Sequence, residues 1–262
     1  LLWAASPAPA QTNNVVYNFP DDSLYLHGRY VYQRNCLICH GERGDGKGQM
    51  AAGMLPPPRN FTSGIFKYRS TPPGALPTDH DLMRTVRQGI SGTSMPIFAT
   101  LSDRDVRAVT QYIKYFSPKW KQKQNFAAPL DLPDAPDWFF QPAAPAELEK
   151  HAAKGKALFA QSCAACHGNE GGGDGPASAT LQDAWGNAIK PADLRKPAIR
   201  SGPERRDMFR AISTGLSGTP MPSFAETLSE EQRWELIAFI EQLRQEPRAA
   251  AGQKADEKQL GN

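Results

Sequence analysis

Cys36-Leu37-Ile38-Cys39-His40 and Cys163-Ala164-Ala165-Cys166-His167 are the two stretches that decide the fold of this 262-residue chain. They contain all four cysteines of the sequence, and in each a histidine directly follows the second cysteine. Two thiols three positions apart lie on the same side of a helical turn, so both can bond to one ligand. Because no cysteine is left over, the sequence does not predict a disulfide framework.

The spacing C-x-x-C-H is the attachment signature of c-type haem, in which two thioether bonds hold the porphyrin and the histidine binds the iron. A four-cysteine zinc site is an alternative, but its cysteine pairs are typically about 15 to 20 residues apart and neither histidine would be needed. A thioredoxin-like pair requires a preceding strand, which the sequence does not show. We therefore expect two covalently bound haem c groups, held by Cys36, Cys39 and His40 and by Cys163, Cys166 and His167.

The two motifs belong to an internal repeat. Cys36 and Cys163 are 127 residues apart, and the segments GISGTSMP at 89–96 and GLSGTPMP at 215–222 are 126 residues apart. This period is far too long for a solenoid, so the sequence indicates a tandem duplication in which each copy is a domain.

Apolar periodicity predicts that both copies are mostly helical, which makes the fold class all-α. The first helix of each copy is expected over 28–39 and 155–166. The last helix is expected over 102–116 and 229–243, each beginning at a serine suited to cap it. The apolar face of each last helix is predicted to be buried; it is formed by Val106, Val109, Ile113 and Phe116 and by Leu236, Phe239, Ile240 and Leu243.

The predicted organisation has five segments: an N-terminal tail at 1–20, a first domain at 21–117, a linker at 118–146, a second domain at 147–246 and a disordered tail at 247–262. The linker contains six prolines, which predict a stiff, semi-extended segment. Its aromatic residues Trp138-Phe139-Phe140 are expected to pack on a neighbouring domain, with contact to a partner as the second interpretation.

The ends and charges of the chain bear on location and partners. LLWAASPAPA at 1–10 is typical of the end of an export signal, with a disordered tail as the alternative. No apolar run approaches the roughly 18 residues of a membrane span, so no transmembrane segment is expected.

The net charge of +3 is too small to indicate nucleic-acid binding. Up to Leu130 the chain has 15 basic and 8 acidic residues, and after it 15 and 19. The two halves are therefore expected to dock different partners.

The second axial ligand of each iron should recur in both copies, and only methionine does. Met95 and Met221 both lie in Gly-Thr-x-Met-Pro, 59 and 58 residues after the first cysteine of their copy. The proline that follows disfavours helix at the methionine and places it in a loop. A thioether ligand raises the reduction potential. We predict that the irons are bound by His40 and Met95 and by His167 and Met221.

The remaining methionines and histidines are not expected to bind iron. His27 and His80 are interpreted as surface residues. The segment 41–47 matches most of a phosphate-binding loop, but Gly48 replaces the serine or threonine that would hold magnesium, and we interpret it as a flexible turn. The methionines interpreted as core residues are Met50, Met54, Met83 and Met208.

With these motifs the chain resembles the class I cytochromes c, in particular the bacterial di-haem members built from two such domains. The resemblance covers about 28–116 and 155–243. It implies that a glycine and an aromatic residue of each first helix meet an aromatic residue of the last helix. It also implies that a proline carbonyl accepts a hydrogen bond from the iron-binding imidazole. The residues in question are Gly28, Tyr32 and Tyr112, then Gly155, Phe159 and Phe239, and the prolines Pro58 and Pro191.

These observations predict a periplasmic di-haem cytochrome that carries single electrons between redox partners, free or as a subunit of a larger redox complex, and that is not an enzyme. Histidine and methionine on opposite faces would leave neither iron with an open position. The alternative is a di-haem enzyme such as a peroxidase or a thiosulfate-oxidising cytochrome. No cysteine is spare for such a role, both copies carry the methionine loop, and Glu42 and His80 form an unconvincing acid–base pair.

Overall fold

The computed structural model describes residues 15–140, 145–197, 199–202 and 204–259 of the chain. Within these ranges the chain is helical, with two isolated β-bridges and no strand, so the predicted all-α class is confirmed. None of the described helices combines the length and apolar character that a membrane span requires. The elements are η1 (Asp22–Leu24), α1 (Tyr25–Asn35), α2 (Leu37–His40), η2 (Phe61–Ser63), α3 (Asp79–Gln88), α4 (Asp103–Lys114), η3 (Pro118–Lys121), η4 (Lys123–Asn125), α5 (Asp137–Phe140), α6 (Pro145–Ser162), α7 (Ala164–His167), η5 (Ser178–Thr180), α8 (Arg205–Thr214) and α9 (Glu230–Gln259).

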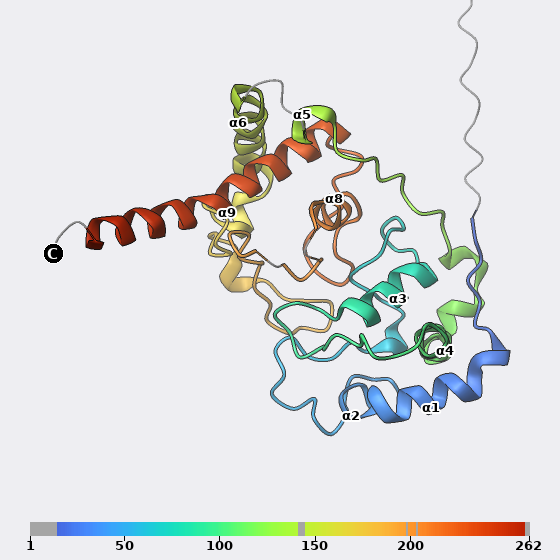
Figure 1. The fold of residues 1–262 in the computed structure, drawn as a ribbon. Coiled ribbons are helices and arrows are strands. Elements are labelled where there is room, and N and C mark those ends of the chain that lie inside the picture. Colours follow the sequence, from blue (N-terminus) through green and yellow to red (C-terminus); the bar gives the residue numbers. More distant parts are fainter. Residues whose placement is uncertain (1–14, 141–144, 198, 203, 260–262) are drawn as a thin grey trace, which may run out of the picture.

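The first domain is organised by the crossing of α1 and α4 (Figure 1). Gly28 lies at this crossing, where a Cβ atom would stand 2.2 Å from the carbonyl oxygen of Ala108. The missing side chain therefore allows the two backbones to approach closely. One turn further along α1, Tyr32 packs against Tyr112 of α4, with ring centroids 5.3 Å apart. This arrangement confirms the glycine and aromatic contacts that the resemblance implies.

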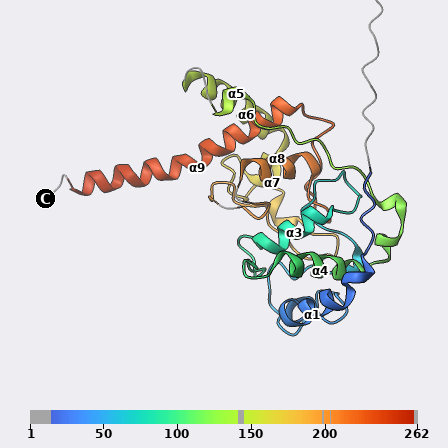
Figure 2. The same ribbon diagram turned by 45° about the vertical axis from the view of Figure 1, so that its right-hand side comes forward.

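The second domain repeats the arrangement with α6 and α9. At Gly155 a Cβ atom would stand 1.9 Å from the carbonyl oxygen of Glu235, and the rings of Phe159 and Phe239 meet edge to face at 5.3 Å. In both views the helices α1, α3 and α4 form one half of the molecule, and α6 to α9 form the other (Figures 1 and 2). The internal repeat therefore corresponds to two domains side by side.

The predicted caps of the last helices are confirmed. The hydroxyl of Ser102 accepts from the backbone N–H of Asp105 at 3.1 Å, and that of Ser229 accepts from Gln232 at 3.2 Å. In both cases the side chain three residues on returns a hydrogen bond to the backbone N–H of the serine. Each last helix thus begins at a reciprocal capping box.

Each domain has its own hydrophobic core, built on the predicted apolar faces of the last helices. In α4 the residues Val106, Val109 and Ile113 are buried, and Phe116, just after this helix, is partly buried. All four predicted residues of α9 are buried. The aromatic side chains Phe61 and Phe66 and, in the second domain, Phe159, Phe209 and Trp234 complete these cores.

The first part of the predicted linker belongs to the core of the first domain. Trp120 has no exposed surface and Phe126 is 8% exposed. The backbone is also tied to this domain, since Leu76 N–H donates to the carbonyl oxygen of Asn125 and Leu130 N–H to that of Ser70. A semi-extended spacer is therefore the wrong description of this part, because burying large aromatic rings outweighs the proline-imposed stiffness.

The last part of the linker packs on the second domain. Phe139 is buried in the second core, and the ring of Trp138 stacks on that of His151 at 3.8 Å. The prediction that this aromatic cluster packs on a neighbouring domain is confirmed for these two residues, whereas Phe140 is 58% exposed. Residues 141–144 lie outside the described ranges.

The chain ends depart from the predicted tails. The structure already packs residues 15–20 on the first domain, where the rings of Phe19 and Phe126 meet at 5.2 Å, because aromatic side chains there gain from burial. The interpretation of 1–10 as an export signal concerns residues outside the described ranges.

At the C-terminal end, α9 continues to Gln259 and extends away from the molecule (Figure 2). This helix corrects the predicted disorder of 247–262 up to Gln259. This segment is rich in the strong helix formers alanine, lysine and glutamine.

The two domains meet through Arg69 and Arg84 of the first. Arg69 is 2% exposed and donates to the carbonyl oxygens of Thr214 at 2.8 Å and Gly215 at 3.3 Å, at the end of α8. A guanidinium at a helix C-terminus satisfies carbonyl groups that lack a partner within the helix. Arg84 lies 3.8 Å from Asp207 of the second domain. These contacts hold segments of the second domain against the first.

Candidate haem-binding sites

The short helices α2 and α7 carry the two C-x-x-C-H motifs. The sequence predicted continuous helices, but the chain bends at Cys36 and Cys163, where φ is −121°, and a new helix begins. After each motif the glycine-rich loop folds back, because the N–H groups of Gly46 and Gly173 donate to the carbonyl oxygens of the two motif histidines at 2.9 and 2.8 Å. The predicted turn is therefore present, and it is hydrogen-bonded against the motif.

Each motif histidine is oriented through Nδ1. Nδ1 of His40 lies 3.0 Å from the carbonyl oxygen of Arg59, and Nδ1 of His167 lies 3.2 Å from that of Ala192. A carbonyl oxygen can only accept, so Nδ1 carries the proton and Nε2 keeps its lone pair. This is the tautomer that binds a metal through Nε2 while a hydrogen bond fixes the ring.

The carbonyl acceptors are not the predicted prolines. Pro58 and Pro191 each directly precede the acceptor, and their own carbonyl oxygens lie 2.6 Å from where a Cβ atom of Gly46 or Gly173 would stand. Successive carbonyl groups of extended backbone point in opposite directions, so the proline oxygen faces the glycine loop and the next oxygen faces the histidine. The resemblance therefore located the right segments but the wrong residues, although Pro58 does line the first cavity.

Burial lowers the pKa of both histidines, an effect that the backbone hydrogen bond partly opposes. His40 is 8% exposed. A lowered pKa keeps the imidazole neutral at pH 7, which is the form that binds a metal ion.

The two methionine loops share one hydrogen-bond pattern. In the first, Ile90 N–H donates to the carbonyl oxygen of Met95 at 3.1 Å, and in the second Leu216 N–H donates to that of Met221 at 3.1 Å. The threonine of each loop donates to the carbonyl oxygen of the same isoleucine or leucine, at 2.8 and 2.7 Å. It also accepts from the backbone N–H of the methionine. Both methionines are therefore held in matching turns.

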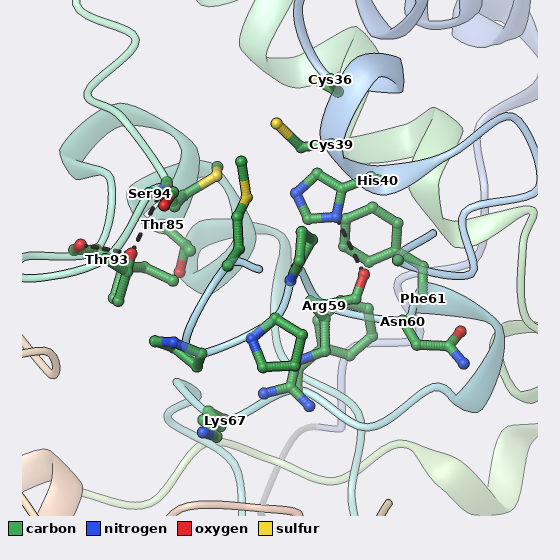
Figure 3. Close-up of a pocket in the computed structure, with 18 of the residues that line it drawn as sticks. Cys36, Cys39, His40, Arg59, Asn60, Phe61, Lys67, Thr85, Thr93 and Ser94 are labelled. Atoms are coloured by element: carbon green, nitrogen blue, oxygen red, sulfur yellow. Dashed lines mark hydrogen bonds between the residues drawn. The ribbon is translucent and has the colours of Figure 1, made fainter. Parts of the chain in front are cut away.

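One cavity of about 550 Å³ joins the first motif to the first methionine. Cys36, Cys39, His40 and Met95 all line it. Figure 3 shows the two cysteines and the histidine together at one end and Lys67 at the opposite end. The apolar part of the wall is formed by Phe61, Phe66, Leu82, Val86, Ile90, Phe98, Val109 and Ile113.

The cysteines fit thioether formation rather than a zinc site. All four are free thiols. Burial raises the pKa of Cys36 to about 12 and that of Cys163 to about 11, with a smaller contribution from the neighbouring cysteine of each motif. A structural zinc site would need such thiols grouped with two or more further ligands. Among the described residues, no cysteine takes part in a group of three or more metal-binding side chains.

Two of the methionines assigned to the core lie elsewhere. Met54 lines the first cavity, and Met50 is 54% exposed. Both precede the segment at 55–60, whose path no local pattern specifies, so their burial depends on tertiary structure. Met208 is buried at 2% exposure and Met83 is partly buried, so the core interpretation holds for these two residues.

The predicted surface histidines lie away from the cavity wall. His80 is exposed, and Nε2 of His27 is 2.7 Å from Asp105 Oδ1 at the start of α4. Glu42, the other candidate acid–base residue, is also exposed and does not line the cavity.

Sequence reasoning missed a polar group in the cavity wall. Lys67 and Tyr68 of the first domain and Trp185 and Arg200 of the second line the same cavity as His40. The internal repeat does not indicate these residues. It shows only residues that recur at equivalent positions of the two copies, whereas this group is assembled from different positions of two domains.

An all-α fold built twice, with a thiol pair, an oriented imidazole and a methionine loop in each copy, defines a tandem c-type haem protein. Residues 152–244 match the Cytochrome c family, and residues 24–113 match the family of Cytochrome C oxidase, cbb3-type, subunit III. The chain belongs to the di-haem cytochromes c. It therefore carries two covalently bound haem c groups and functions in electron transfer.

A solved structure supports this assignment over most of the chain. The chain is similar to one from the Kuenenia stuttgartiensis reducing HAO-like protein complex Kustc0457/Kustc0458, with 34% sequence identity and a TM-score of 0.75. The match covers 88% of this chain and 99% of that chain. No curated protein matches the sequence.

Proposed function

We propose that this protein is an exported, periplasmic di-haem cytochrome that passes single electrons between redox partners and is not itself an enzyme. The observation that carries the proposal is the matched pair of sites: each copy offers a neutral histidine with a free Nε2 and a methionine in the same hydrogen-bonded turn. When bound, each haem supplies an iron that alternates between the ferric and ferrous states. His40 with Met95 and His167 with Met221 would hold the two irons, which would leave no open position for a substrate.

The protein side chains set the conditions for transfer. In the first domain the apolar wall around His40 and Met95 excludes water from the cavity, which stabilises the lower charge of the reduced state. The carbonyl oxygen of Arg59 holds the imidazole in one orientation. The structure of a fixed, water-poor site changes little between the ferric and ferrous states. A small structural change favours fast electron transfer.

Membership of a larger redox complex forms part of the proposal. The similar chain of known structure comes from a multi-protein complex, which supports this role here. Export to the periplasm is supported by the apolar start of the sequence and by haem attachment, which the resemblance to bacterial cytochromes c places outside the cytoplasm.

The first domain offers a docking face for a redox partner. Ile38, Leu55 and Ile97 are 45 to 82% exposed and directly adjoin residues that line the cavity. Met50 is 54% exposed, and its backbone N–H donates to the carbonyl oxygen of Ile38. In the second copy, the positions of Ile38, Met50 and Ile97 are Ala165, Ala177 and Ser223. Arg43 and Lys47 are exposed beside the first motif. We therefore propose a partner with an apolar patch and acidic residues for the first domain.

An absorption spectrum of the oxidised protein tests the proposal. The weak sulfur-to-iron band in the far red should have the intensity of two methionine-bound haems, and cyanide should bind slowly or not at all. High-spin features in the resting protein would contradict the proposal and favour the peroxidase or thiosulfate-oxidising alternative.

Reduction of the cytochrome by its isolated partner should slow as salt concentration rises, because salt screens the attraction between opposite charges on the two proteins. A rate independent of salt would contradict the docking face.

A further inference from the structure

Lys67 lies at the end of the first cavity opposite Cys36 and Cys39 (Figure 3), and charged residues of both domains lie close to it there. The first domain contributes Arg59 and Lys67, and the second contributes a group of four residues. These are Asp183, Trp185, Asn187 and Arg200.

The second-domain loop is held in place at this end. The carboxylate of Asp183 accepts from the backbone N–H of Trp185 at 3.0 Å and from that of Asn187 at 2.9 Å, which closes the loop on itself. The guanidinium of Arg59 then lies over the ring of Trp185, with Cζ 4.7 Å from the ring centroid. This cation–π contact joins the two domains at the cavity wall.

The cluster has an excess of positive charge. It contains three cations, Arg59, Lys67 and Arg200, and one carboxylate, Asp183, which the loop already engages. None of the three cations forms a side-chain hydrogen bond or ion pair with a described residue. Burial and the charges of the two arginines lower the pKa of Lys67 to about 8. Partly buried cations that repel one another are stabilised by an anion between them.

Haem itself supplies such an anion. Its two carboxylate side chains lie on the porphyrin edge opposite the edge that forms the thioether bonds. A porphyrin attached at Cys36 and Cys39 therefore directs its carboxylates toward the end of the cavity where Lys67 lies. Arginine and lysine are the side chains that bind carboxylates most strongly.

We propose that Arg200 and Trp185 of the second domain complete, with Arg59 and Lys67 of the first, the carboxylate-binding site of the haem attached to the first domain. The first haem then bridges the two domains, and its reduction potential depends on a residue from the other copy. The inference rests on haem binding alone, so it stands whether the protein is a carrier or part of an enzyme.

Arg200→Gln in the full-length holoprotein tests the proposal by redox titration of both haems. Loss of a cation beside the carboxylates should lower the potential of the first haem only. The expected change is about tenfold in the equilibrium constant for electron exchange between the haems, or about 59 mV for one electron. The first haem is assigned by NMR contacts of its methyl groups with Leu82 and Val86, which line the cavity.

Three variants serve as controls. Arg205→Gln removes an equal charge from the surface of the second domain, where Arg205 pairs with Glu241, and should leave both potentials unchanged. Arg200→Lys keeps the charge and should retain most of the wild-type potential. Lys67→Gln removes a charge of the first domain and should also lower the reduction potential of the first haem. This variant keeps the test decisive if Arg200→Gln does not fold.

Two results would overturn the proposal. One is a first-haem potential in Arg200→Gln and Lys67→Gln equal to that of the Arg205→Gln control. The other concerns a soluble anion as the ligand of the cluster. If inorganic phosphate shifts the first-haem potential of the wild type but not of Arg200→Gln, the cluster binds a free anion rather than the haem carboxylates.

Discussion

At the scale of single residues, two thioether side chains line the first cavity, Met54 and Met95. Only Met95 lies in the turn that both copies share, where its backbone N–H and carbonyl are both hydrogen-bonded. A ligand must be held in place to stay bound to the iron, so the shared turn favours Met95 as the axial residue.

Met95→Leu should remove the far-red sulfur-to-iron band of one haem and lower its reduction potential, because a neutral sulfur ligand stabilises ferrous iron. The shift should fall within the range of about 0.8 V that axial ligands span. Met54→Leu is the matched control and should keep both the band and the potential. Loss of the band in the control instead would show that Met54 is the ligand.

Tyr32 shows how the copies differ in detail. It is 1% exposed, and its hydroxyl donates to the carbonyl oxygen of Gly41 at 2.7 Å, directly after the first motif. The second copy has Phe159 at this position and lacks the bond. The motif therefore folds without it, and the hydroxyl adds stability to the first domain only.

Tyr32→Phe should lower the free energy of unfolding by about 1 kcal/mol, the net value of one buried hydrogen bond. Chemical denaturation of the holoprotein measures this change. Tyr30→Phe, at a position that is 56% exposed on the same helix, should have no measurable effect. Equal stability of the two variants would show that the buried bond contributes nothing.

At the scale of elements, the crossings of α1 with α4 and of α6 with α9 fix each domain. Both depend on a glycine, since a Cβ atom would stand within 2.2 Å of a backbone oxygen of the facing helix. A glycine in a helix interior normally costs stability relative to alanine. Its presence here is explained by close packing of the two backbones rather than by helix propensity.

Gly155→Ala should therefore destabilise the second domain by about 1 to 3 kcal/mol, although alanine is the better helix former by about 1 kcal/mol. Thermal unfolding followed by circular dichroism checks this. The control is Ala153→Ser at an exposed position of α6, which should change the stability little. A stabilised Gly155→Ala protein would contradict the close crossing.

At the scale of the whole molecule, each haem site is connected to the opposite domain. Trp185 and Arg200 reach the first cavity, and Arg69 binds the carbonyl oxygens of Thr214 and Gly215, where the loop that carries Met221 begins. Buried contacts of this kind tie the geometry of one site to the position of the other domain.

Arg69→Gln should lower the stability of the domain contact by about 1 to 3 kcal/mol, because it removes the donor to the carbonyl oxygen of Thr214 at the end of α8. Hydrogen exchange should become faster across 215–221. Arg104→Gln removes an exposed charge from α4 and should leave exchange there unchanged. Unaltered exchange in Arg69→Gln would contradict a role for this residue in holding the methionine loop.

The sequence by itself determined the haem motifs, the duplication, the helix caps and the methionine loops. All of these are encoded by residues a few positions apart or by a repeat of such patterns, and local geometry fixes where their side chains lie. Only the tertiary structure decided that Arg59 and Ala192 orient the histidines, that Trp120 and Phe139 bury the linker, and that Arg200 reaches the first cavity. These contacts join residues far apart along the chain, and their partners are selected by packing, which no local pattern records.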